Sequence, residues 1–171
     1  MFETDFGRIS ILTCFDLNYP ELWQRCDDLD ADIVFWPSAY GGGSPLNAMA
    51  ILYHYYIVPV GAGNIIDITG KPLDSVEKPR DRQFIATLDL DRTFVHVDFT
   101  KEKMERLLRE HAGEVEIESF PGSKAWTLLR SIKPGVRARE LCAQYKIETL
   151  RQYQHRSREK INEARKAGTA I

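Results

Sequence analysis

Residues 9–21 read Ile9-Ser10-Ile11-Leu12-Thr13-Cys14-Phe15-Asp16-Leu17-Asn18-Tyr19-Pro20-Glu21. The first seven are mostly large apolar or β-branched residues, which predicts a buried strand over residues 9–15. Pro20 suits the first position of a helix, and we expect that helix to continue over about residues 21–29. Cys14 is therefore predicted at a strand-to-helix turn, where ligands collect in open α/β sheets. A nucleophilic thiol is one interpretation, and a buried cysteine that acts as a small hydrophobe is the other.

Strands and helices continue to alternate after this turn. Residues 33–36 predict a second buried strand that Pro37 ends. Ser44 is expected to cap a helix with Pro45 in its first turn, and residues 57–60 return to strand. This β-α-β-α-β order predicts a mixed α/β fold. Apolar segments at residues 65–68 and 83–88 predict a hairpin-like end to the sheet.

The C-terminal part of the chain has a different character. Residues 101–108 predict a short surface helix, and Pro-Gly pairs at residues 121–122 and 134–135 precede a long helical tail. Residues 136–171 carry a net charge of +5 and the rest of the chain −7. An apolar stripe along the tail could pack on the acidic part of the chain, pack on another subunit, or simply belong to a solvated helix: Leu141, Tyr145, Leu150, Tyr153 and Ile161.

Composition narrows the class of protein. The chain has 171 residues, 43% hydrophobic and 28% charged, with a formal net charge of −2. That balance gives no whole-chain attraction to nucleic acid or anionic lipid, so we expect neither as a partner. Three cysteines without paired spacing, no basic-then-apolar N-terminal segment and no 18-residue apolar run favour a cytoplasmic protein that is not bound to a membrane. No metal-ligand spacing or cofactor motif occurs, and the four histidines are scattered, so no cofactor or metal is expected.

The segment Gly7–Glu21 resembles the nucleophile motif of the nitrilase, or carbon–nitrogen hydrolase, superfamily. That motif is a glycine, an apolar strand, cysteine, an aromatic, an acidic residue and then Pro-Glu. The resemblance extends over about residues 1–95, through three further segments: residues 31–39, residues 58–64 with 67–71, and residues 85–91. It implies a C-terminal half of a family domain at residues 1–95 and a mostly helical C-terminal extension at residues 96–171.

The implied fold is half of an α-β-β-α sandwich followed by a helical tail. In the family, a second half supplies the facing sheet, so one exposed apolar sheet face is expected here. The family also uses a Glu general base and a Lys that lie upstream of the cysteine strand, whereas only thirteen residues precede Cys14. We therefore expect the triad to be incomplete in this chain and the chain alone to be inactive.

The resemblance also implies the site and its chemistry. Cys14 is the expected nucleophile, the backbone N–H of Phe15 an expected oxyanion donor, and Tyr19, Ala39 and Tyr40 the expected substrate-binding residues. The expected parent protein is a hydrolase that cleaves a small amide, N-carbamoyl compound or nitrile through a thioester, and forms a homodimer or larger assembly. The alternative is a noncatalytic, half-length module for oligomerisation or binding. Cys26 and Cys142 are expected to be inert packing residues.

Overall fold

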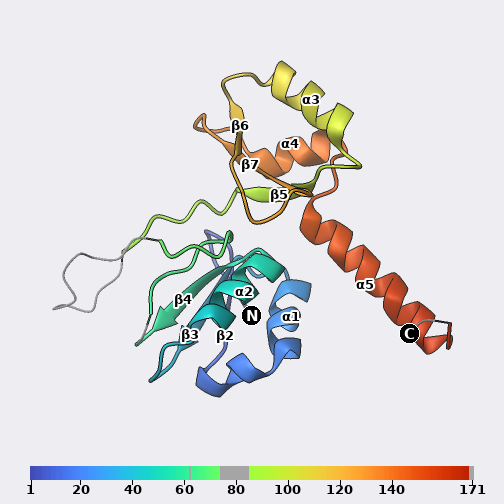
Figure 1. Ribbon diagram of the computed structural model, residues 1–171. Coiled ribbons are helices and arrows are strands. Elements are labelled where there is room, and N and C mark those ends of the chain that lie inside the picture. The colour runs from blue at the N-terminus through green and yellow to red at the C-terminus, as the bar shows by residue number, and fades with distance from the viewer. Residues whose placement is uncertain (62, 74–84, 170–171) are drawn as a thin grey trace. The chain divides into compact units, whose positions relative to one another are not determined.

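The computed structural model describes residues 1–61, 63–73 and 85–169, and shows a mixed α/β chain (Figure 1). It divides into two compact units, Met1–Leu90 and Asp91–Ile171, which are described separately below. The division precedes the predicted boundary at residue 95 because Asp91 already belongs to the second unit. Its carboxylate accepts hydrogen bonds from the backbone N–H groups of Ala138 and Arg139 at 2.5 and 3.2 Å.

The first unit contains a four-stranded sheet in the order β1-β2-β3-β4. Its strands are β1 (Phe2–Glu3), β2 (Arg8–Ile11), β3 (Ile33–Pro37) and β4 (Tyr56–Val60). The short β1 is antiparallel to β2, whereas β2, β3 and β4 are mutually parallel. The predicted β-α-β-α-β order is confirmed here, because each pair of parallel strands is joined by a helical crossover.

Both helices of this unit pack on the same face of the sheet. Helix α1 (Pro20–Asp28) begins at the predicted Pro20, and helix α2 (Ser44–Tyr53) follows the Gly41–Gly43 turn. The cap of α2 is Gly43 and not the predicted Ser44, since Gly43 adopts φ +59° and Ser44 is already helical. The shared core joins the two helices to the strands: Trp23, Cys26, Val34, Trp36, Leu46, Ala50 and Ile57 are among its buried members.

The opposite face of the parallel strands is apolar and partly exposed. Ile11, Phe35 and Val58 lie side by side in the sheet register. Ile11 is 52% exposed and Val60 48%, while Phe35 and Val58 are half-buried. An exposed apolar sheet face was expected from the sequence. Parallel sheets in proteins are usually covered on both faces, so this face is a surface that another layer could cover.

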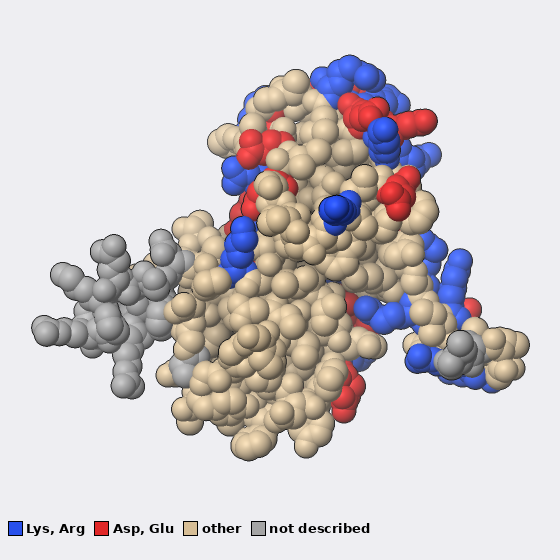
Figure 2. All heavy atoms as spheres, viewed as in Figure 1, with Lys and Arg blue, Asp and Glu red and all other residues tan. Residues whose placement is uncertain are grey.

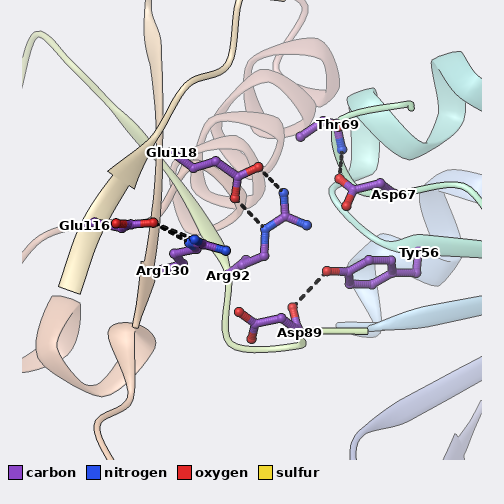
Figure 3. Close-up of polar contacts among 8 residues, drawn as sticks. All are labelled: Tyr56, Asp67, Thr69, Asp89, Arg92, Glu116, Glu118 and Arg130. Carbon is purple, nitrogen blue, oxygen red and sulfur yellow. Dashed lines mark hydrogen bonds and ion pairs between the residues drawn. The ribbon is translucent and has the colours of Figure 1, made fainter. Parts of the chain in front are cut away.

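The predicted hairpin after β4 is wrong where the structure describes it. Ile66 instead makes isolated antiparallel bridges to Ile57 and Pro72, and residues 85–88 form no strand. Gln83 and Phe84, which began the second predicted strand, lie outside the described residues. Local polar contacts hold this part of the unit: Asp67 Oδ1 accepts from Thr69 N–H at 2.7 Å, and Tyr56 Oη donates to the Asp89 carbonyl at 2.8 Å (Figure 3).

The second unit contains an antiparallel sheet that the sequence prediction missed. Its strands are β5 (Thr93–His96), β6 (Val115–Glu118) and β7 (Trp126–Ser131), in the order β5-β7-β6. Two ion pairs stabilise this sheet: Arg92 contacts Glu118 at 2.7 and 3.0 Å, and Arg130 contacts Glu116 across the β6–β7 register (Figure 3). The helices are α3 (Lys101–Glu110), α4 (Ala138–Gln144) and α5 (Leu150–Lys166).

The predicted long C-terminal helix is interrupted. Helix α4 ends where Lys146 adopts φ +53°, and α5 begins after Thr149. The apolar stripe is therefore split, because Leu141 belongs to α4 whereas Leu150 is the buried residue of α5. Within the described parts of the chain, no helix combines the length and the apolar composition needed to cross a membrane.

Candidate active site

Cys14 follows strand β2 but does not belong to it. The last ladder hydrogen bond runs from Leu12 N–H to the Phe35 carbonyl at 3.0 Å. Thr13 is still extended, and Cys14 then turns to φ +48° and opens a short 3-10 helix, η1 (Cys14–Asn18), that leads into α1. The predicted strand to Phe15 is thus wrong in its last residues, since β2 ends at Ile11.

The backbone of Cys14 is in the left-handed region, which only glycine adopts without cost. For other residues this conformation costs about 1–2 kcal/mol. Such residues persist where surrounding contacts hold them, and they cluster at functional sites. The side chain is half-buried at this turn, so the sulfur is neither sealed in the core nor freely solvated.

Two aromatic side chains hold the carbonyl group of Cys14. Trp36 Nε1 donates to this oxygen at 3.1 Å, and Tyr40 Oη at 3.4 Å. Trp36 is completely buried on the neighbouring strand, and its ring meets that of Tyr40 edge-on at 5.4 Å. The neighbouring parallel strand and the loop after it therefore determine the orientation of the Cys14 peptide unit.

Asp16 stabilises the same turn from its other side. Its carboxylate Oδ2 accepts from the Thr13 N–H at 2.7 Å, and its carbonyl accepts from Trp23 Nε1 at 3.0 Å. The turn is thus attached both to the strand that enters it and to helix α1. This combination explains how a strained residue can persist at Cys14.

The N–H group of Phe15 is available as a donor. It lies in the first turn of η1, where no earlier helical carbonyl can accept from it, and it makes no hydrogen bond to another described residue. The Phe15 ring is 72% exposed and 6.2 Å from the ring of Tyr40. The N–H of the residue after a nucleophile is a common oxyanion donor, because it can lie about 3 Å from the oxygen that becomes negative when the nucleophile adds.

The structure brings some of the predicted site residues together and leaves others apart. Cys14, Phe15 and Tyr40 form one contact group through the carbonyl and ring contacts above. Tyr19 precedes α1 and is 53% exposed, and Ala39 is exposed; among the described residues neither contacts Cys14 by a hydrogen bond. Sequence analysis missed the roles of Trp36 and Asp16.

The other two thiols have a different environment from Cys14. Cys26 lies in the core of the first unit and Cys142 in that of the second. Burial raises the pKa of the Cys26 thiol, and it raises the pKa of Cys142 to about 12. The prediction that both are packing residues is confirmed by their burial.

No general base is assembled at Cys14 within the described residues. No Glu, Lys or His of these residues makes a hydrogen bond or ion pair with its sulfur, and Glu21 is exposed in the first turn of α1. Comparisons with protein-family models, curated proteins and solved structures find no match to this chain.

Proposed function

We propose that this chain is part of a cysteine-dependent hydrolase that cleaves a non-peptide C–N bond, with Cys14 as the nucleophile. The observation that carries the proposal is the left-handed Cys14 at the end of a parallel strand, immediately before a helix. A strained strand-to-helix turn is how several hydrolase folds expose a nucleophile above a sheet. The resemblance of residues 7–21 to the carbon–nitrogen hydrolase motif limits the proposed substrates to amides, N-carbamoyl compounds and nitriles.

The proposed chemistry has two steps. For an amide, the Cys14 sulfur adds to the carbonyl carbon, the C–N bond breaks, and the nitrogen leaves as ammonia or an amine after it gains a proton. Water then attacks the thioester, which releases the carboxylic acid and returns the thiol. The oxygen that becomes negative in each addition would accept a hydrogen bond from the Phe15 N–H. Trp36 and Tyr40 are positioning residues, because they hold the Cys14 carbonyl and not the substrate.

The proposal requires two further groups. The resemblance assigns the general base to a Glu and a second oxyanion donor to a Lys, and it places both upstream of the cysteine strand. General base catalysis is typically worth about 10²–10⁴-fold, and loss of one oxyanion donor costs about 10²–10³-fold. The chain alone is therefore expected to show little or no turnover.

The test measures ammonia release from a panel of small amides, N-carbamoyl compounds and nitriles. The chain is assayed alone and with any in-frame coding sequence before Met1 restored, each beside its Cys14→Ala variant and a Cys26→Ala control. A rate that appears on restoration and depends on Cys14 but not on Cys26 supports the proposal. A restored protein whose Cys14→Ala variant is equally active would refute it.

The exposed apolar sheet face supports a second candidate, a noncatalytic module for oligomerisation or binding. Ile11 and Val60 are about half exposed on a parallel sheet, as expected of a surface that another chain covers. The same assay separates the two candidates. If the chain is an association module, none of these assays should show turnover that depends on Cys14. The exposed apolar sheet face should still act as an interface.

A further inference from the structure

The second unit carries two adjoining hollows that the proposed hydrolase does not use. One has a volume of about 310 Å³ and is lined by Lys103, Arg106, Gln144, Tyr145 and Lys146. The other, of about 190 Å³, is lined by His96, Phe99, Thr100, Lys103, Lys146, Glu148 and Tyr153. Lys103 and Lys146 border both, so the two hollows form one groove with two lysines at its centre. We call it the Lys103–Lys146 groove.

The charge of this groove is not balanced by its own carboxylates. Glu148 is engaged by Arg156 through two hydrogen bonds, at 2.8 and 2.9 Å. Next to the groove, Glu110 accepts from Arg106 at 2.8 Å and from Tyr145 at 2.5 Å. Hydrogen bonds from Arg156 and from Tyr145, respectively, lower the pKa values of Glu148 and Glu110, so both stay ionised but already paired at neutral pH.

The two lysines, in contrast, have ammonium N–H groups that can donate to a ligand. Lys103 Nζ donates one hydrogen bond, to the Lys146 carbonyl at 2.6 Å, and an ammonium has three N–H groups. The exposed Lys146 side chain makes no ion pair or hydrogen bond with another described residue. Lys and Arg lie among Asp and Glu on α3, and this helix contributes Lys103 and Arg106 to the groove (Figure 2). The centre of the groove is therefore suited to an anion.

One side of the groove is an aromatic cluster. The His96 and Phe99 rings stack at 4.9 Å between centroids, and the Phe99 and Tyr153 rings at 5.9 Å, both with an interplanar angle of 28°. Phe99 is 66% exposed, so much of its ring is open to a ligand. An exposed ring beside cationic groups is the arrangement that binds a nucleobase together with its phosphate.

The backbone at Lys146 is an independent observation. After α4, the Lys146 N–H donates to the Ala143 carbonyl and the Ile147 N–H to the Cys142 carbonyl, which is the Schellman arrangement of a helix end. The left-handed residue of this motif is usually glycine, but here it is Lys146 at φ +53°. Glycine would adopt this conformation without strain. The lysine at this position therefore indicates a role for its side chain in the groove.

We propose that the Lys103–Lys146 groove binds a nucleotide, with the phosphate on the two ammonium groups and the base stacked on Phe99. Free nucleoside phosphates and the nucleotides of a single strand share this chemistry. This site is independent of Cys14, and it revises the expectation from the net charge of −2 that the chain has no nucleic-acid partner, because the positive charge is local to this unit.

Calorimetric titration of the full chain tests the proposal with four probes: adenosine 5′-monophosphate, adenosine, inorganic phosphate and an oligoadenylate of about ten nucleotides. The variants are Lys146→Gly, Phe99→Ala and a control, Lys124→Ala, whose exposed lysine lies outside the groove. Lys146→Gly removes the charge while it suits the backbone, so its melting temperature should not fall. Loss of binding in this variant cannot then be attributed to unfolding.

The expected result is that adenosine 5′-monophosphate or the oligoadenylate binds, and that Lys146→Gly and Phe99→Ala each weaken binding about tenfold or more while Lys124→Ala does not. A strand that binds far more tightly than the monophosphate, and weakens steeply with salt, identifies the source as single-stranded nucleic acid. Equal affinities identify a free nucleotide. The proposal is overturned if neither probe binds at millimolar concentration, or if folded Lys146→Gly or Phe99→Ala binds as the unchanged chain does.

Discussion

The turns at Cys14 and at Lys146 have the same backbone conformation, but they differ in the burial of the side chain that stabilises it. In each, a residue other than glycine adopts φ near +50°, and a side chain donates to its carbonyl: Trp36 at 3.1 Å to Cys14, and Lys103 at 2.6 Å to Lys146. Trp36 is fully buried, whereas Lys103 is exposed. A buried donor fixes a turn in one geometry, while an exposed ammonium can exchange its partner. The first arrangement suits a positioned nucleophile and the second a ligand-binding lysine.

The largest expected effect that tests this comparison is thiol reactivity. At pH 8, Cys14 should react with iodoacetamide at least about a hundredfold faster than Cys142, because only its sulfur is partly exposed and a thiol with a pKa of about 12 is almost wholly protonated. A raised pKa means that reactivity appears as the pH rises, so native Cys142 should gain about tenfold per unit between pH 8 and 11. Mass-spectrometric labelling rates measure both effects.

Cys26 provides the internal control for this measurement. It shares the first unit with Cys14, but it is buried in the core and its pKa is raised. It should therefore label as slowly as Cys142. Equal labelling of Cys14 and Cys26 in the folded chain would remove the distinction between a positioned thiol and a packing thiol.

The next largest effect concerns the donor that holds the Cys14 carbonyl. Trp36→Phe removes the indole N–H and part of a fully buried side chain, so the free energy of unfolding of the first unit should fall by about 2 kcal/mol. Tyr40→Phe removes only a longer hydrogen bond from a partly exposed ring and should cost less than about 1 kcal/mol. Denaturant unfolding followed by circular dichroism compares the two variants. Similar losses for both would show that burial does not distinguish the donors.

In the second unit, the matched change should have a small effect. Lys103→Met keeps most of the side chain and removes the exposed donor to the Lys146 carbonyl. Since exposed, flexible donors contribute little net stability, we expect less than about 0.5 kcal/mol from the same denaturant experiment. A loss as large as that of Trp36→Phe would show that the hydrogen bond from Lys103 stabilises the fold, and that its ammonium is not available to a ligand.

A third effect, on association, tests whether the exposed apolar sheet face is an interface. Sedimentation should show a dimer or larger assembly, and Ile11→Glu should weaken it about tenfold, because a charge would be buried on that face. Ile161→Glu is the control, since Ile161 is similarly exposed, at 47%, but lies on α5 in the other unit. A monomer at tens of micromolar, or an equal effect of both variants, would show that the sheet face is not the interface.

The sequence predicted the first unit better than the second for a physical reason. Parallel strands buried on one face and helices with Pro near their first position have strong local signals, so β3, α1 and α2 were placed to within about two residues. In the second unit, β6 reads Val-Glu-Ile-Glu and β7 includes Arg130, and their stability comes partly from cross-strand pairs such as Glu116–Arg130. Such pairing joins residues far apart in sequence and has no local period.

The candidate site shows the same limit. Cys14, Phe15 and Tyr40 could be found from a motif and from the order of strands, but the roles of Trp36 and Asp16 depend on geometry. Trp36 reaches the Cys14 carbonyl only because β2 and β3 are parallel neighbours. Thr13 and Asp16 do have the three-residue spacing of a capping box, which is a signal that could have located the start of η1 and ended the strand earlier.

A final pair of substitutions compares the strain of the two turns directly. Cys14→Gly and Lys146→Gly should each raise the free energy of unfolding of their unit by about 0.5–1 kcal/mol, because relief of a left-handed backbone, about 1–2 kcal/mol, exceeds the entropy that glycine adds to the unfolded chain. Asp30→Gly, at φ +58°, is the control, since aspartate tolerates this conformation better and should gain less. Denaturant unfolding measures all three. If Cys14→Gly destabilises its unit while Lys146→Gly stabilises the other, the Cys14 side chain contributes packing that outweighs its strain, and the turn would be a structural feature and not one retained for its thiol.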